Sequence, residues 1–497
     1  MAKKKLKRKR TFRRKQKGHS QHASLAGLAP VIEARGIFLP IHSNVQIPQK
    51  TVFYRPTDKL VFATLGIISG IETVSDINTT LRVDRALLTA FGYPSCAEQS
   101  VIQETLDACT EKNVLQLEIA IEKLFEQHNL SKAYLEQAFK QQKVVTIDLD
   151  LSGQPASKNA EGSSKGYFSG KRNIYGRQLA RVLFPDTQEI VAEALYPGNR
   201  HSCKVFKEMA GRMEKILYLD TKEKRCLVRL RLDGGFGTDE NINYALWRGY
   251  EVLAKMFSGN RARVLAQSVE QWMDAPTQTQ KENNQPATRQ VGWVRKPHRY
   301  MRKTRQFAIR TKNKKRKRGY SYSVIVTTDI ESDLFVLLQD YDDRGGIPES
   351  SFCQDNQGLK QRKRRKKKFT AQQILTLLCR LAHNLIQWIK HWMIRALEQQ
   401  KRMEQIADQI GAKSLSWEQI EMDTTQCQIQ LVIQSIKERG IKRFVRQIFS
   451  LNGEVIFKKG RVKHLILNPL YPLINRFRTA FEVLLKPYDI EVSLAGT

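Results

Sequence analysis

The stretch VVTIDLDLS, Val144–Ser152, decides how this sequence folds. Its β-branched and aliphatic residues are typical of a buried strand. Asp148 and Asp150 stand two residues apart on it, so their side chains lie on the same face of the strand. A carboxylate within an apolar strand loses its hydration, and it persists there only if it is paired or binds a cation. The stretch therefore predicts a core strand that also carries chemistry.

The segments that follow this strand predict one mixed sheet. We expect the second and third strands over Gln178–Phe184 and Glu189–Leu195, followed by a helix over Ser202–Ile216. We then expect the fourth strand over Cys226–Asp233, a second helix over Asn241–Trp247 and the fifth strand over Tyr250–Met256. Meandering strands followed by strands that alternate with helices favour an α/β sheet with helices packed on it. In such a sheet the first and fourth strands are neighbours.

A chain of 497 residues is too long for one compact core, so we expect a multidomain α/β protein. The main domain is expected in two parts, residues 143–257 and 331–400, separated by a β-rich basic insertion over residues 258–330. A basic disordered tail (residues 1–24) and a helical N-terminal region (residues 25–142) precede it, and a C-terminal region (residues 401–497) follows. In the second part we expect a strand over Leu334–Leu338 and a long helix over about Thr370–Leu397, whose apolar residues recur at helical spacing.

The charge of the chain points to a polyanionic partner. The chain has 84 Lys and Arg residues against 49 Asp and Glu residues, which gives a net charge of +35. The hydrophobic fraction of 41% is high enough to exclude a globally disordered chain. Eleven of the cations lie in residues 3–17, 13 in residues 295–318 and 8 in residues 360–368, and these three runs contain no acid. Runs of one sign are typical of contacts to a phosphate backbone, although the first also fits a tail that binds nonspecifically.

Other protein classes are disfavoured. The seven cysteines are scattered without a CxxC spacing, which favours a reducing compartment over a disulfide scaffold or zinc site. The longest apolar run, Val61–Ile71, is about half of what a membrane span needs, and the basic start lacks the apolar stretch of a secretory signal. We therefore expect no membrane partner.

Four acids stand out as candidate catalytic residues. Asp233 ends the fourth strand and is followed by Gly234 and Gly235, which let a backbone or ligand approach closely. Glu349, behind Pro348, is expected to open a helix. Together with Asp148 and Asp150 these acids could converge on Mg²⁺, and two such ions can assist a phosphoryl displacement. The alternative is that each acid is a cap, turn or salt-bridge residue.

The residues from Asp148 to Asn384 resemble the catalytic core of DDE insertion-sequence transposases of the Tyr-Arg-Glu-Lys signature group, which have a ribonuclease H-like fold. The quoted motifs are IDLDLS (147–152), RLDGGF (231–236), YDDRGGIPE (341–349), and QGL followed by a basic stretch and LAHN (357–384). The segment GIETVSDIN (70–78) is similar to the helical region with which such proteins hold transposon ends. The resemblance covers roughly residues 60–390.

This resemblance implies cut-and-paste transposition with two ions of Mg²⁺ or Mn²⁺, held by Asp150, Asp233 and Glu349, with Asp148 assisting. Tyr341 and Arg344 would contact phosphates near the cleaved end. The expected partners are double-stranded DNA, as transposon ends and as target, and a second copy of the chain in a homodimer. The expected location is the cytoplasm of a prokaryotic cell, at the nucleoid. Two departures stand out: four residues separate Arg344 from Glu349 instead of three, and Asn356 occupies the position of the signature lysine, for which Lys360 is a possible substitute.

Further DNA contacts are expected from the basic runs and the insertion. We expect phosphate contacts from Arg316, Lys317, Arg364 and Arg365, and base stacking by Trp293, for which a core position is the plainer alternative. Two other functions stay open. One is a Mg²⁺-dependent structure-specific nuclease on the same fold, and the other is a catalytically dead or domesticated DNA-binding copy.

Overall fold

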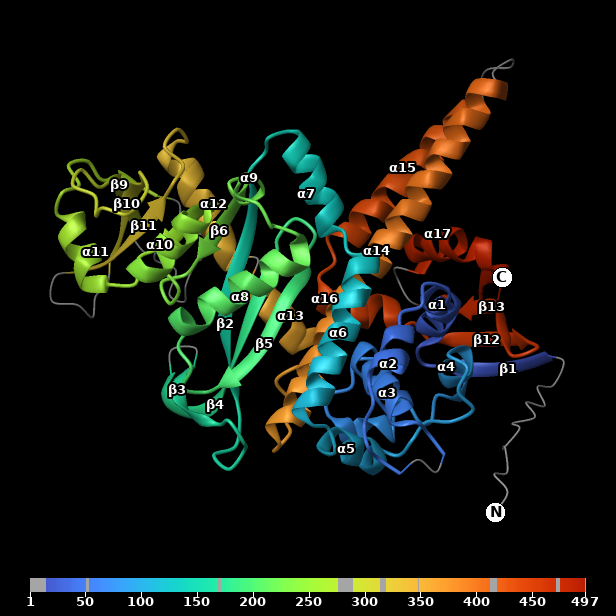
Figure 1. Cartoon of the computed structure of the whole chain (residues 1–497). Coiled ribbons are helices and arrows are strands. Elements are labelled where there is room, and N and C mark those ends of the chain that lie inside the picture. The colour runs from blue at the N-terminus through green and yellow to red at the C-terminus, as the bar shows by residue number, and fades with distance from the viewer. Residues whose placement is uncertain are drawn as a thin grey trace. The chain divides into compact units, whose positions relative to one another are not determined.

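A computed structural model describes residues 15–50, 53–168, 171–275, 289–312, 319–346, 348–411, 418–470 and 474–496. The chain divides into two compact units (Figure 1). The central unit comprises Phe125–Cys353 and Lys366–Phe369. The terminal unit comprises Met1–Leu124, Gln354–Arg365 and Thr370–Thr497. Each unit is built on its own sheet.

The central unit is built on a 10-stranded sheet with the strand order β3-β4-β2-β6-β7-β11-β10-β9-β8, and β5 pairs with β4. The strands are β2 (Val145–Pro155), β3 (Ser164–Phe168), β4 (Lys171–Phe184), β5 (Glu189–Pro197), β6 (Val228–Leu232), β7 (Glu251–Lys255), β8 (Met273–Asp274), β9 (Arg289–Trp293), β10 (Arg305–Lys312) and β11 (Tyr320–Thr327). Strands β2, β6 and β7 run parallel to one another, and the other pairings are antiparallel.

This topology confirms the α/β fold class and the mixed sheet expected from the sequence. The first and fourth strands of the predicted order, β2 and β6, are hydrogen-bonded neighbours. The sequence between β5 and β7 supplies the two predicted helices, α8 (Ser202–Leu217) and α10 (Asp239–Arg248), with the short α9 (Lys222–Arg225) between them. The strands of residues 258–330 extend the same sheet, because β11 pairs with β7. They do not form a second sheet.

Helical periodicity explains how α8 is held on the sheet. Its buried residues recur every three or four positions, and α8 contacts β2, β4 and β5. Helix α10 begins where the Thr238 side chain accepts a hydrogen bond from the Asn241 N–H, and it ends at Gly249, whose φ of 100° suits glycine. The helices α7 (Ser131–Lys140) and α11 (Gly259–Ala266) complete this part of the unit.

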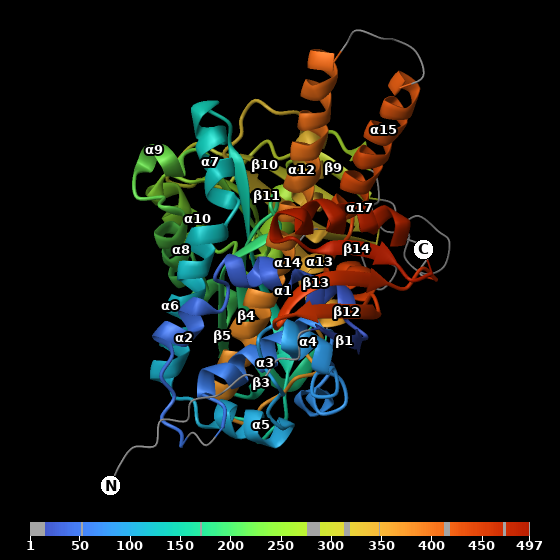
Figure 2. The ribbon, with the colours of Figure 1, turned by 90° about the vertical axis from the view of Figure 1, so that its right-hand side faces the viewer.

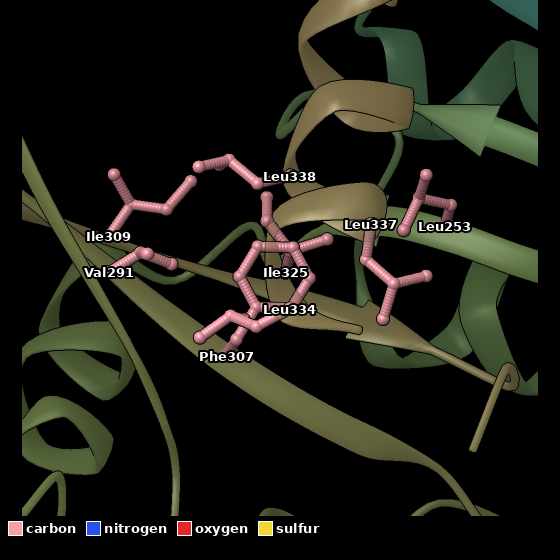
Figure 3. Close-up of a cluster of buried hydrophobic side chains, with 8 residues drawn as sticks. All are labelled: Leu253, Val291, Phe307, Ile309, Ile325, Leu334, Leu337 and Leu338. Carbon is pink, nitrogen blue, oxygen red and sulfur yellow. The ribbon is translucent and has the colours of Figure 1, made fainter. Parts of the chain in front are cut away.

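Helix α12 (Leu334–Gly346) replaces the strand that we expected over Leu334–Leu338. Leu334, Leu337 and Leu338 pack against a buried cluster with Leu253, Val291, Phe307, Ile309 and Ile325 (Figure 3). Spacings of three and four residues bring these leucines to one face of a helix, whereas in a strand they would be divided between two faces. The short apolar run Leu334–Leu338 did not distinguish the two patterns. Helix α13 (Pro348–Gly358) follows directly, as predicted for a helix opening at Glu349.

The terminal unit contains a four-stranded sheet, β1-β12-β13-β14 (Figure 2). Its strands are β1 (Lys15–Ser20), β12 (Gly453–Lys458), β13 (Arg461–Leu467) and β14 (Glu491–Leu494). Strand β1 corrects the expected tail, because residues 15–20 pair with β12 and α1 (Ala23–Ala34) begins three residues later. The first 14 residues lie outside the described residues.

Helices occupy the N-terminal region of this unit, as the periodicity predicted. They are α2 (Leu39–Asn44), α3 (Pro56–Ile68), α4 (Arg85–Ala90), α5 (Gln99–Asp107) and α6 (Glu111–His128), whose last residues belong to the central unit. The C-terminal part adds α14 (Phe369–Gly411), α15 (Glu418–Lys437), α16 (Ile441–Phe444) and α17 (Ile474–Leu485). The stripe Ile374, Leu378, Leu381, Leu385 and Ile389 of α14 is buried, as expected. Within the described part of the chain, no helix has the length and apolar character that a bilayer crossing requires.

Candidate active site

Two of the predicted acids meet where the parallel pairing of β2 with β6 ends. Leu149 of β2 pairs with Leu232 of β6, and Leu232 pairs with Ala254 of β7. The residues one step further along these strands are Asp150, Asp233 and Lys255, so these three follow one another across the end of the sheet. Both acids are half-buried. The sequence motifs IDLDLS and RLDGGF are thus brought together by strand register.

Asp148 occupies a different environment from Asp150. Its side chain is completely buried and receives two hydrogen bonds from Arg231 of β6, from Nε to Oδ1 at 2.6 Å and from Nη2 to Oδ2 at 2.7 Å. Burial raises the pKa of Asp148, and the guanidinium beside it opposes that rise. Because both oxygens are bound by Arg231, Asp148 acts as the partner of a buried cation.

Asp233 is shaped by the glycine-rich turn that follows it. Its Oδ1 accepts hydrogen bonds from the Gly235 N–H at 2.8 Å and the Phe236 N–H at 3.3 Å. A Cβ atom on Gly237 would lie 1.8 Å from the carbonyl oxygen of Lys255, so this close approach of turn and strand requires glycine. The turn fixes one oxygen of Asp233. No hydrogen bond from the described residues reaches its other oxygen, Oδ2.

Helix α12 brings Tyr341 and Arg344 to the same end of the sheet. The Arg344 Nη1 lies 3.6 Å from Asp150 Oδ1, and the side chain is largely buried. Burial alone would lower the pKa of Arg344, but Tyr341, Asp150 and Asp233 together raise it above its ordinary value. Burial also raises the pKa of Tyr341 to about 12. The Arg344 Nε and Nη1 atoms are buried without a hydrogen-bond partner among the described residues.

Two ion pairs fix α12 over the strands. Arg289 of β9 binds both carboxylate oxygens of Asp342 at 2.6 and 2.8 Å, and Arg229 of β6 binds Asp340 at 3.1 Å. Tyr341 lies between these two anchored residues, and Arg344 follows two residues after Asp342 on the same helix. The Tyr-Arg part of the predicted motif is therefore placed beside Asp150 and Asp233.

Glu349 lies in the first turn of α13, but its side chain lies outside the described residues. The helix is tied to the sheet by Arg181 of β4, the residue that pairs with Asp150 across the strands. Arg181 donates to Ser351 Oγ of α13 at 2.7 Å and to Glu193 Oε1 of β5 at 2.8 and 2.6 Å. Among the described side chains, no three His, Cys, Asp or Glu residues form a group suited to a metal ion. The role of Glu349 in a triad stays a prediction.

The basic residues expected to bind phosphate fall into three groups. Lys360 forms an ion pair with the partly exposed Glu72 at 2.9 Å, and the buried Arg364 donates to the carbonyl oxygens of Ile71 and Leu359, so both already have partners within the terminal unit. Arg365 is exposed and donates to the Arg362 carbonyl oxygen. Arg316 and Lys317 lie outside the described residues.

Trp293 packs in the manner of a core residue. It lies on β9 against the buried cluster of Figure 3, with its ring 5.9 Å from that of Phe307 in an edge-to-face arrangement. The Arg305 guanidinium covers the indole at 3.6 Å from the ring centroid. This packing favours the core alternative over base stacking.

Sequence reasoning missed two residues of this region. Lys255 follows the apolar run Val252–Ala254, and a single cation at the end of a buried strand was a signal that could have found it. Arg181 is likewise a single cation, within the otherwise apolar stretch Leu179–Phe184 of β4. Their contacts depend on strand register, which the sequence does not specify.

The strand order, with antiparallel β4 beside β2 and parallel β6 and β7 on its other side, together with half-buried acids on the neighbouring strands β2 and β6, defines a protein of the ribonuclease H-like fold class. The family model of the transposase DDE domain, group 1, matches residues 29–410, and the chain belongs to this family. It is therefore a transposase of the DDE type. The structure is also similar to that of a piggyBac transposase in a synaptic complex with hairpin DNA, with 10% sequence identity, coverage of 88% of this chain and 87% of that chain, and a TM-score of 0.42. No curated protein matches the sequence.

Proposed function

We propose that this transposase cleaves DNA at transposon ends and transfers the freed strand to target DNA, in the manner of the Tyr-Arg-Glu-Lys group. The observation that carries the proposal is the juxtaposition of Asp150 and Asp233, each one residue beyond the last pair of β2 with β6, with Arg344 3.6 Å from Asp150. An interior with two neighbouring acids and a buried guanidinium suits a reaction in which cations and phosphates meet. Because two ends must be joined to one target, we propose that the protein acts as a homodimer on double-stranded DNA.

The donor set fits a divalent cation. Carboxylate oxygens are the ligands that Mg²⁺ prefers, and the Oδ2 atom of Asp233 carries no hydrogen bond from the described residues. We propose that Asp150, Asp233 and Glu349 hold Mg²⁺ or Mn²⁺. When bound, the ions would activate the attacking oxygen and stabilise the leaving oxygen. Asp148 is outside this set because Arg231 binds both of its oxygens.

The residues of α12 would orient the substrate. The planar guanidinium of Arg344 suits a phosphate better than an ammonium does, because its N–H groups bind two oxygens at once. Its hydrogen-bonding atoms Nε and Nη1 are buried without partners among the described residues, which suits a group that acquires a ligand with the substrate. Tyr341, on the same helix as Arg344, would contact a neighbouring phosphate.

Exposed members of the basic runs would hold the DNA backbone. Arg302 and Arg305 are occupied by Glu251 and by the Ile330 carbonyl oxygen, whereas Lys296, Arg299 and Lys303 are exposed. In the second run, Arg365, Lys367 and Lys368 are exposed. We propose that these exposed residues, rather than Lys360 and Arg364, contact phosphates without reading sequence.

The proposal is tested by incubating the purified protein with supercoiled plasmid and Mg²⁺ or Mn²⁺. We expect nicked and linear products from the wild type and from the control Lys143→Met. Lys143 is exposed and lies two residues before the first residue of β2, away from the acids. Asp150→Asn, Asp233→Asn and Glu349→Gln should each lose cleavage. Cleavage without joined products would indicate the nuclease alternative. No cleavage by the wild type under any of these conditions would contradict the proposal.

A further inference from the structure

Lys255 is built into the same end of the sheet as the two acids. It is the last residue of β7 and stands one step beyond Ala254, which pairs with Leu232 of β6. It therefore lies beside Asp233. Its aliphatic stem passes over the turn after Asp233, since a Cβ atom on Gly234 would lie 3.6–3.8 Å from three of its carbons. Backbone and turn thus aim this side chain along the acids.

The ammonium of Lys255 is half-buried and has no hydrogen-bond or ion-pair partner among the described residues. Burial lowers the pKa of Lys255, Asp233 acts in the opposite direction, and Arg344 and Arg289 lower it further. The chain treats another desolvated lysine differently, because Lys390 donates to the carbonyl oxygens of Lys437 and Arg439. A desolvated ammonium that has no hydrogen-bond acceptor among the described residues and is repelled by two guanidiniums is unfavourable unless an anion binds to it.

We propose that the Lys255 ammonium binds a phosphate group of the DNA strand that lies at Asp150 and Asp233. The inference rests on the proposed function and adds a substrate contact to it. Phosphate is the anion that this position can receive, because the acids alone would repel a nucleic-acid strand and Arg344 offers a cation on their other side. An ammonium serves as a point charge there, whereas Arg344 supplies a planar fork. The competing role is that of a simple counter-charge for Asp233.

The test compares Lys255→Met with Lys255→Arg, the wild type and the control Lys143→Met. Binding of a short fluorescent DNA duplex is measured by anisotropy over a series of salt concentrations in Ca²⁺, with gel analysis to verify that the duplex stays intact. Loss of one phosphate contact should reduce the slope of log affinity against log salt by about 0.9 for duplex DNA. We expect this reduction for Lys255→Met only, with Lys255→Arg close to the wild type.

Thermal melting without DNA separates the two roles. Removing a desolvated cation on which Arg344 and Arg289 act unfavourably should leave the melting temperature of Lys255→Met unchanged or raised. An unchanged salt slope, or a lowered melting temperature with an unchanged slope, would overturn the inference and indicate a counter-charge. These readouts do not require cleavage. A reduced slope in a protein that cleaves no plasmid would retain the phosphate contact and reject the proposed chemistry, whereas an unchanged slope in an active protein would reject the contact alone.

Discussion

Replacing Asp148 and Asp150 one at a time should change the stability of the protein by very different amounts, although both acids lie on one face of β2. In the wild type, the guanidinium of Arg231 donates two hydrogen bonds of 2.6 and 2.7 Å to the Asp148 carboxylate. Asp148→Asn leaves this guanidinium buried beside a neutral amide. Breaking a buried ion pair in this way costs about 3–5 kcal/mol, because the remaining charge is desolvated without compensation. We therefore expect Asp148→Asn to destabilise the central unit strongly.

Asp150→Asn should have a small effect on stability. Asp150 lies 3.6 Å from Arg344, which Asp233 and Tyr341 also stabilise, so Arg344 keeps part of its compensation. The substitution also relieves repulsion between the neighbouring acids Asp150 and Asp233. We expect a change in the free energy of unfolding within about 1 kcal/mol, because the ion pair with Arg344 is long and Arg344 keeps its other stabilising neighbours.

Urea unfolding followed by circular dichroism measures both effects, with the midpoint of the affected transition as the readout. The double variant Asp148→Leu/Arg231→Met provides the control, because it removes the pair without stranding a charge and should recover much of the loss. An unfolding free energy of Asp148→Asn within about 1 kcal/mol of the wild type, or an equal loss for Asp150→Asn, would refute the division of roles between the two acids.

Three further substitutions test other parts of the site. Asp233→Asn should reduce metal-dependent cleavage by several orders of magnitude while DNA binding, measured by anisotropy, is retained. Gly237→Ala should cost about 1–3 kcal/mol in urea unfolding, because its Cβ would lie 1.8 Å from the Lys255 carbonyl oxygen, whereas Gly234→Ala, with ordinary contacts of 3.6 Å, should be tolerated there. Trp293→Ala should lower the unfolding free energy by up to about 3 kcal/mol and leave cleavage per folded molecule unchanged, and the reverse pattern would favour base stacking.

The sequence predicted the central sheet because each of its core strands and helices has a clear period. Alternating or β-branched runs marked β2, β4, β5, β6 and β7, and the spacing of apolar residues marked α8 and α14. The prediction of a strand over Leu334–Leu338 was wrong because five consecutive apolar residues fit a helix and a strand equally well. Only the leucines at 334, 337 and 338, once packed on the sheet, decide for the helix.

The candidate site could be predicted in part, because its acids sit in recognisable motifs while their partners do not. Asp148 and Arg231 are 83 residues apart, and only the register of β2 against β6 brings them together. The basic run at 360–368 also has partners that lie far from it in the sequence. Its composition suggests a uniform phosphate-binding segment, but Glu72, nearly 300 residues earlier, forms ion pairs with both Lys360 and Lys363. Long-range pairing of this kind leaves no local trace in a sequence.

Two cations flank the half-buried acids Asp150 and Asp233 across the sheet. Arg181 pairs in register with Asp150, and Lys255 stands beyond Asp233, so the row reads cation, acid, acid, cation across β4, β2, β6 and β7. The two ends of the row differ in one respect. Arg181 binds Glu193 and Ser351 and thereby ties the helix of Glu349 to the sheet, while the Lys255 ammonium makes no comparable contact among the described residues. A row with one fixed cation and one cation open to a ligand provides a structural end and a substrate end, which is why the salt dependence of DNA binding should depend on Lys255.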